Sequence, residues 1–309
     1  MVTERGMTLR RIAAVAAILT FAASVFAPML RSGARAQRTE RTTCAANIRQ
    51  LAGAFLLYAE DHDDRFPLAM TVDGETGRWR TGEDFKVDDY GPFPWNWRVT
   101  QGRARRSENL THWANAVTAY VPTYDIYRCP VSPARSLVES GIPAKEYSDY
   151  DRSAAPLPVT YTFNGLLHTY ESSAVEASEK LPLLWEGNGK VSFLGFARHN
   201  PYLKCTTIDE PCVYRPGGPP CGGHFASKKD RLSPAASYFI HGQGMHFAYV
   251  DGHAAHVTLG VPVPRAGAGT WTDYRVDPFP EYEEGGYPTM AFFDGCHAWF
   301  FRPAYEFDR

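Results

Sequence analysis

The sequence has no excess of charge of either sign. Its 32 lysines and arginines nearly balance its 34 aspartates and glutamates, which gives a formal net charge of -2. Proteins that bind nucleic acid over a broad surface carry a basic excess, so the near balance argues against that class. We therefore expect no nucleic-acid partner.

The sequence also lacks the short motifs that mark common enzyme classes. It contains no Gly-x-Ser-x-Gly elbow, no P-loop and no His-Glu-x-x-His pair, the patterns that place a nucleophile, a phosphate cradle or a catalytic zinc ion. We therefore predict a protein without catalytic residues and without a required cofactor. A structural metal ion is the one cofactor left open.

Composition favours a folded head made of strands and structured loops. Hydrophobic residues make up 44% of the chain and charged residues 21%, as in globular proteins. Glycine and proline are frequent after residue 65, together with aromatic residues, a mixture typical of short strands. The predicted fold class is α+β: a long N-terminal helix packed on an antiparallel sheet head with long loops.

An uncharged run begins close to the N-terminus. Residues 12–30 carry no charged side chain, and a helix of that length crosses roughly 30 Å of hydrocarbon. We predict a membrane-spanning helix over residues 7–30. The alternative is a cleaved export signal, since Ala34-Arg35-Ala36 resembles a signal-peptidase site, and the product would then be a secreted soluble protein.

An amphipathic helix is predicted over residues 31–64. Its apolar positions recur at steps of three and four residues, which places them on one face, and Pro67 stops the helix. We expect this stripe to pack on the head, residues 65–309. The stripe consists of Cys44, Ile48, Leu51, Phe55, Tyr58 and Ala59.

The cysteines predict disulfide bonds, because an exported, oxidising compartment lets them pair. Spacing alone does not choose the pairs. A zinc cluster of Cys205, Cys212, Cys221 and His224 is the alternative, but its spacings fit no compact zinc knuckle. The disulfide candidates are Cys44, Cys129, Cys205, Cys212, Cys221 and Cys296.

Local patterns predict several elements of the head. Residues 111–120 indicate a short helix, and residues 159–164 and 181–186 indicate strands. Residues 200–230 are rich in proline, glycine and cysteine and predict a disulfide-braced loop. The aromatic residues of the segment 71–109 are expected to anchor a long loop by burial rather than to bind sugars or peptides.

Two hairpins are predicted near 245–259 and 287–301. Asp251-Gly252 lies between two alternating runs and favours a type I′ turn, in which both central residues need positive φ. Met245, Phe247 and Tyr249 would then share one face. The second run, YPTMAFFDGCHAWFF, repeats the design with Asp-Gly at its centre.

Histidines around the first hairpin are candidate metal ligands. His241, His246, Asp251 and His253 offer nitrogen and carboxylate donors suited to zinc, although strand alternation prevents all four from converging unless the turn helps. A structural hydrogen bond from His241 to the turn is the alternative, and it is the one we favour.

The N-terminal residues resemble a type IV prepilin leader. Arg5-Gly6-Met7-Thr8-Leu9 matches the junction at which a short basic leader is cut after glycine, which implies a leader of residues 1–6 and a mature chain that begins at Met7. Pro28 falls where prepilin helices carry a kinking proline. Arg11 stands where prepilins carry glutamate, so it cannot pair with a neighbouring subunit's N-terminus.

Three further patterns resemble a bacterial pseudopilin-like family of unknown function. They are the helix pattern that begins at Cys44, the pair Cys129-Pro130, and His241 followed after nine residues by Asp251-Gly252. In that family the late Cys-Pro pair accompanies the helix cysteine, and the resemblance implies a Cys44 to Cys129 disulfide. The signature residues His241, Asp251 and Gly252 have no established role there.

The resemblance implies a non-enzymatic component of a type II secretion or type IV pilus-like system. The helix would contact the bacterial inner membrane, and the head would lie on the periplasmic or extracellular side, with the cell surface as one such location. Pilin-like subunits or secretion machinery would be its partners. The alternative is a membrane-anchored head that binds a ligand or acts as a metal-dependent enzyme, since histidines and aromatic residues are plentiful.

Overall fold

The structure, a computed structural model, describes seven ranges of the chain: 38–80, 90–150, 152–201, 203–214, 236–263, 271–288 and 297–304. The predicted leader and the predicted membrane segment, with Gly6 and Met7, lie outside these ranges. Within them no helix is both long enough and apolar enough to cross a bilayer. The chain divides into two compact units, residues 1–43 and residues 44–309.

A long helix spans residues 38–61. It ends where Asp63 and Asp64 adopt left-handed φ angles of 52° and 59°, so it stops three residues before the predicted boundary at residue 64. The predicted apolar stripe is confirmed from Cys44 onward, because its residues are buried and Leu57 on the opposite face is 49% exposed. The buried stripe residues are Cys44, Ile48, Leu51, Phe55 and Ala59, and Tyr58 is half-buried.

The main sheet has six strands and confirms the α+β class. All neighbouring strands are antiparallel except β4 and β7, which are parallel, so the sheet is mixed rather than purely antiparallel. In order the strands are β1 (Tyr90–Pro92), β7 (Phe196–His199), β4 (Thr162–Phe163), β5 (Pro182–Trp185), β8 (Gly244–Tyr249) and β9 (Ala254–Thr258).

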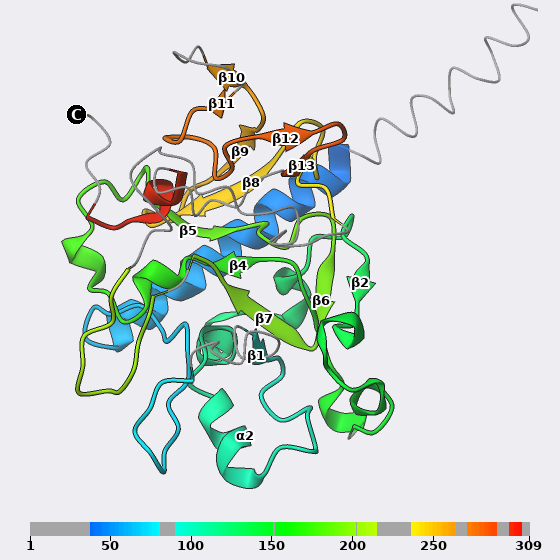
Figure 1. The fold of residues 1–309 in the computed structure, drawn as a ribbon, viewed down its shortest axis with the longest axis vertical. Coiled ribbons are helices and arrows are strands. Elements are labelled where there is room, and N and C mark those ends of the chain that lie inside the picture. Colours follow the sequence, from blue (N-terminus) through cyan, green and yellow to red (C-terminus); the bar gives the residue numbers. More distant parts are fainter. Residues whose placement is uncertain are drawn as a thin grey trace, which may run out of the picture. The chain divides into compact units, whose positions relative to one another are not determined.

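The helix lies across one face of this sheet, behind β4, β5 and β8 in the view of Figure 1. Phe55 is the centre of the contact: its ring lies 5.0 Å from that of Phe163 on β4 and 5.7 Å from that of Trp113. All three side chains belong to one continuous apolar core. The amphipathic stripe and the sheet therefore bury each other, as the three- and four-residue spacing requires.

Smaller elements surround this core. A three-stranded sheet consists, in order, of β2 (Ala134–Arg135), β6 (Ser192–Leu194) and β3 (Pro158–Val159). Two short strand pairs are β10 (Pro262–Val263) with β11 (Trp271–Thr272), and β12 (Tyr282–Glu283) with β13 (Tyr287–Pro288). The short helices are α2 (Arg103–Asn109), α3 (Trp113–Ala116), η2 (Val117–Tyr120), η3 (Tyr124–Tyr127), η4 (Val138–Ser140), η5 (Ala144–Tyr147), η6 (Arg152–Ala154), η7 (Gly165–Leu167), η8 (Ser172–Ala174) and η9 (His297–Phe301).

Several predicted elements are confirmed and two need correction. Residues 111–120 form α3 and η2, and residues 181–186 contain β5. The run 159–164 is divided between β3 and β4, which belong to different sheets. The predicted return strand of the 287–301 hairpin is wrong, because its described end forms the 3-10 helix η9, while residues 289–296 lie outside the described ranges.

The hairpin predicted near 245–259 is present as β8 and β9. Met245 pairs with Val257, and Phe247 pairs with Ala255. The expectation of one buried face is too narrow, since all six residues of β8 are buried. β8 lies between β5 and β9 and is covered on both faces, and this explains why β8 also buries His246.

The aromatic residues of segment 71–109 behave largely as expected. Phe93 and Trp97 are fully buried, whereas Trp79, Tyr90 and Trp95 are half-buried. Trp97 donates its indole N–H to the carbonyl of Gly195 at 2.5 Å. The burial of these rings anchors a long loop against the sheet.

Candidate functional site

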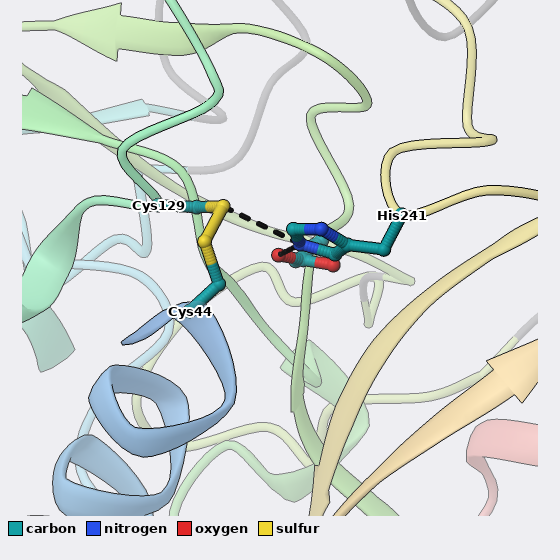
Figure 2. Close-up of side chains that lie close together, drawn as sticks. Cys44, Cys129 and His241 are labelled. Carbon is teal, nitrogen blue, oxygen red and sulfur yellow. Dashed lines mark hydrogen bonds and ion pairs between the residues drawn. A yellow bond between two sulfur atoms is a disulfide. The ribbon is translucent and has the colours of Figure 1, made fainter. Parts of the chain in front are cut away.

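A disulfide bond joins the long helix to the head. Cys44, in the helix, is bonded to Cys129, which follows η3, across a sequence separation of 85 residues. Both side chains are fully buried, and Figure 2 shows the bond between helix and loop. The pairing implied by the family resemblance is thus confirmed.

Hydrogen bonds on either side of the disulfide strengthen the same junction. Asn47 donates its side-chain amide to the carbonyl of Arg128 at 2.8 Å. Tyr161 donates its hydroxyl to the carbonyl of Cys44 at 3.0 Å, and the backbone amide of Cys129 donates to the hydroxyl of Thr160 at 2.9 Å. The last two of these bonds are buried, and together the three bonds define one register between the helix and the head.

His241 lies directly against the disulfide (Figure 2). Its Nε2 atom is 3.5 Å from Cys129 Sγ and 3.1 Å from Glu186 Oε1, and only 7% of the residue is exposed. Because a carboxylate oxygen accepts, Nε2 carries the proton of this bond. The expected bond from the His241 side chain to the hairpin turn is wrong: the ring faces Glu186 and the disulfide instead.

Glu186 is the residue of this cluster that the sequence did not reveal. It immediately follows β5 and is fully buried. Its Oε2 atom accepts the backbone N–H of His246 at 2.7 Å. Burial by itself raises the pKa of this carboxyl group, but the hydrogen bonds and charges of His241 and His246 outweigh it and lower the pKa to about 2.

Two more histidines complete the surroundings of this cluster. The ring of His246 lies 4.5 Å from that of His241, and its Nδ1 atom lies 3.5 Å from Glu186 Oε2. His256 Nε2 donates to the backbone carbonyl of His241 at 3.0 Å. We name Cys44, Cys129, Glu186 and His241 the junction cluster. Its members expose almost nothing to solvent, so a dissolved substrate does not reach them in this conformation.

The predicted metal site does not form as a single group. His241 precedes β8, whereas Asp251 and His253 lie beyond its other end, and six strand residues span about 20 Å. At the turn, Asp251 Oδ1 accepts from His253 Nδ1 at 2.6 Å and from the His253 backbone amide at 3.0 Å. Among the described residues, the four predicted ligands therefore separate into two places.

The hairpin turn also differs from the predicted type. Gly252 has a φ of +86°, but Asp251 is not among the described residues with positive φ, so this is not a type I′ turn. Instead the amide of Gly252 donates to the carbonyl of Tyr249 at 2.9 Å. A β-turn followed by a glycine with positive φ joins the two strands by a longer loop than the two-residue type I′ turn does, and it also accommodates the right-handed twist of the strands.

We expect Gly252→Ala to lower the free energy of unfolding by about 1–2 kcal/mol, since a side chain is strained at positive φ. The added Cβ would also lie 3.1 Å from Leu56 Cδ1. The matched control is Gly53→Ala in the long helix, where no atom of the described ranges lies within 4 Å of the new Cβ. That change should stabilise by about 0.5–1 kcal/mol. Equal effects of both changes in urea unfolding would contradict this expectation.

The second described disulfide joins Cys205 to Cys212. It confirms the disulfide interpretation over the zinc interpretation for these two cysteines and braces the predicted loop. Cys221, His224 and Cys296 lie outside the described ranges, so their predicted roles stay predictions.

A group of buried histidines escaped sequence reasoning altogether. Burial lowers the pKa of His112 to about 3 and that of His168 to about 4, and it lowers the pKa of His199 well below its usual value. These rings are therefore neutral at physiological pH. They come from three separate segments, and no motif spacing connects them.

Comparison with family models, with curated proteins and with solved structures finds no match for this chain. The site must therefore be judged by its own chemistry. It combines a disulfide, an imidazole and a carboxylate in a dry environment, and its visible effect is to fix the helix on the head.

Proposed function

We propose that this chain is a non-enzymatic, pseudopilin-like structural component of a type II secretion or type IV pilus-like system. Its predicted segment 7–30 contacts the membrane, and its head lies on the periplasmic or extracellular side. The observation that carries the proposal is the disulfide between Cys44 and Cys129, which locks the helix to the head where the family pattern places it.

The burial of the signature histidine supports the same function. His241 contacts the disulfide and a buried carboxylate, and Gly252 supplies the left-handed residue of the turn. Two of the three residues of the His-X9-Asp-Gly pattern then serve folding: His241 supports the junction, and Gly252 closes the strand pair that follows it. A structural protein needs such a rigid connection between its helix and its head.

Intact-mass measurement of the protein isolated from membranes tests the proposal. We expect a mature chain that begins at Met7, with an additional mass of four hydrogens if both disulfides of the described part are reduced. A chain that begins at Met1 or at Gln37 would contradict prepilin processing. The complete absence of a membrane fraction would instead favour the secreted, soluble alternative.

A ligand-binding head is the second candidate, and one cleft favours it. The cleft has a volume of about 530 Å³ and is lined by Trp79, His168, Tyr170 and Glu210, among others. His168 is 5% exposed, and its Nε2 has no hydrogen-bond partner in the described part of the chain, while its Nδ1 accepts from the amide of Ala69 at 3.0 Å. Nε2 therefore carries the ring proton, and this N–H is a buried donor beside the cleft rather than an exposed one.

An aromatic ring beside a buried donor suits a neutral saccharide, since sugar rings present both apolar faces and hydroxyl groups. Chemical-shift titration of the full chain with neutral oligosaccharides tests this candidate. Binding that is lost in Trp79→Ala and kept in Tyr124→Ala, an exposed aromatic outside the cleft, would favour it. No binding by any of the saccharides would remove its support.

A further inference from the structure

The junction cluster contains more polar chemistry than a disulfide needs. A disulfide is stable among apolar neighbours, and burying a carboxylate and an imidazole beside it costs free energy unless they are paired. In this chain the two sulfur atoms, one oxygen of Glu186 and one nitrogen of His241 all lie within 4.8 Å of one another. Four donor atoms this close together can serve as the ligands of one metal ion.

We propose that the junction cluster binds Zn²⁺ when Cys44 and Cys129 are thiols. Two thiolates, one imidazole and one carboxylate are ligand types that zinc takes in tetrahedral sites. The site goes beyond the proposed pilin-like function and does not depend on it.

The distances of the cluster fit this geometry. With zinc–sulfur bonds of about 2.3 Å and zinc–nitrogen or zinc–oxygen bonds of about 2.0–2.1 Å, neighbouring ligand atoms of a tetrahedron lie roughly 3.3–3.8 Å apart. Cys129 Sγ already lies 3.5 Å from His241 Nε2, and that nitrogen lies 3.1 Å from Glu186 Oε1. The two sulfur atoms must separate, and cleavage of their bond permits this, while all four ligand atoms already lie within 4.8 Å of one another.

Neighbouring groups hold the ligands in place. The amide of His246 occupies Glu186 Oε2, which leaves Oε1 directed toward His241 and the sulfur atoms. His256 Nε2 bonds to the carbonyl of His241 and restrains the backbone of that ligand. Partners of this kind orient metal ligands in proteins. To bind zinc, the neutral His241 ring carries its proton on Nδ1 and presents a bare Nε2.

The chemistry balances in each direction. The chain is synthesised with thiols, and an external dithiol regenerates them by giving two electrons and two protons to the disulfide while becoming a disulfide itself. Zn²⁺ then replaces the two thiol protons, which are released. In the other direction an external disulfide accepts two electrons from the two thiolates and, with two protons, becomes two thiols, while Cys44 and Cys129 form their disulfide and Zn²⁺ is released. Disulfide and zinc are therefore mutually exclusive ways to connect helix and head.

Cobalt titration of the full chain in detergent, reduced with a phosphine and kept free of oxygen, tests the proposal. We expect one equivalent of Co²⁺ to give the intense visible bands of a tetrahedral thiolate site, and Zn²⁺ to bleach them. The oxidised chain should give no such bands. If the reduced chain loses its fold and neither metal restores it, or if no bands appear, the proposal is wrong.

Variants that retain both Cys44 and Cys129 show whether the metal binds at the junction cluster or at other cysteines of the chain. We expect His241→Gln to weaken Co²⁺ binding more than about 100-fold, beyond the effect of losing a group that only supports a ligand, and Glu186→Gln to weaken it at least about 10-fold. The matched control, Cys205→Ser with Cys212→Ser, should leave the affinity unchanged. Bands that persist in His241→Gln, or that vanish in the control, would assign the metal elsewhere and overturn the proposal.

Discussion

Replacing Cys44 and Cys129 together by serine is expected to lower the free energy of unfolding by about 4–5 kcal/mol. The disulfide closes a sequence separation of 85 residues, and in the chain-entropy model a loop of this length restricts the unfolded chain strongly. Guanidinium unfolding of the full chain in detergent, followed by tryptophan fluorescence, measures the loss. Many domains have a total stability close to this value, so the variant should be largely unfolded at moderate temperature.

The second disulfide provides the matched control for that prediction. Cys205 and Cys212 are separated by only 7 residues, and the same model gives about 2–3 kcal/mol for their loss. Replacement of this pair by serine should therefore leave the head folded. If the two double variants lose equal stability, loop closure is not what the helix–head disulfide contributes.

Replacing Glu186 by alanine is expected to destabilise the protein by about 3–5 kcal/mol, the range for breaking a buried ionic network by removing one partner. Without the carboxylate, His241 Nε2 and the amide of His246 lose their acceptor in a site that water does not reach. Glu186→Gln is the matched variant, since its amide oxygen still accepts from the backbone N–H and should retain part of the stability.

The same pair of variants predicts a dependence on pH. The pKa of Glu186 is lowered from 4.5 to about 2 in the folded state, so the ionised form is favoured by folding. Its contribution, roughly 3 kcal/mol, is complete above pH 4.5 and is lost as the pH falls toward 2. The facing groups are His241, His246 and the hydroxyl of Tyr161.

Measuring the free energy of unfolding at a series of acidic pH values distinguishes the carboxyl group of Glu186 from the other carboxyl groups. The slope of unfolding free energy against pH between about 4.5 and 2 should be smaller in Glu186→Gln than in the parent chain. Asp251→Asn, at the exposed turn, is the control for replacing a carboxyl group by an amide away from the junction cluster. Identical slopes in Glu186→Gln and the parent chain would show that the buried carboxyl is not the titrating group.

Local pattern was enough to predict the helix and its buried stripe. Spacing of three and four residues places Cys44, Ile48 and Phe55 on one face, and a single apolar helix face in a compact protein packs against the core. The strand pair around Asp251-Gly252 followed from turn chemistry in the same way, although the turn type did not. Signals of this sort act over few residues, so a sequence displays them directly.

The junction cluster depends on contacts between distant residues. His241 and Glu186 are separated by 55 positions, and His241 and Cys129 by 112, so no local spacing connects them. A hint for Glu186 exists in hindsight: it is a charged residue directly after four buried strand residues. An acid at the end of such a run needs a buried partner, but only the sheet order, which brings β5 beside β8, identifies it.

The covalent connection between Cys44 and Cys129 also determines how the molecule carries mechanical load. Tension applied between the two ends of the chain enters the head at Cys44 and passes straight through the disulfide to Cys129. Residues 45–128 then lie outside the line of force and cannot be extended while the bond is intact. Reduction would allow residues 45–128 to extend and would add contour length on the order of 290 Å. The head is therefore much less extensible under tension when the disulfide is intact than when it is reduced.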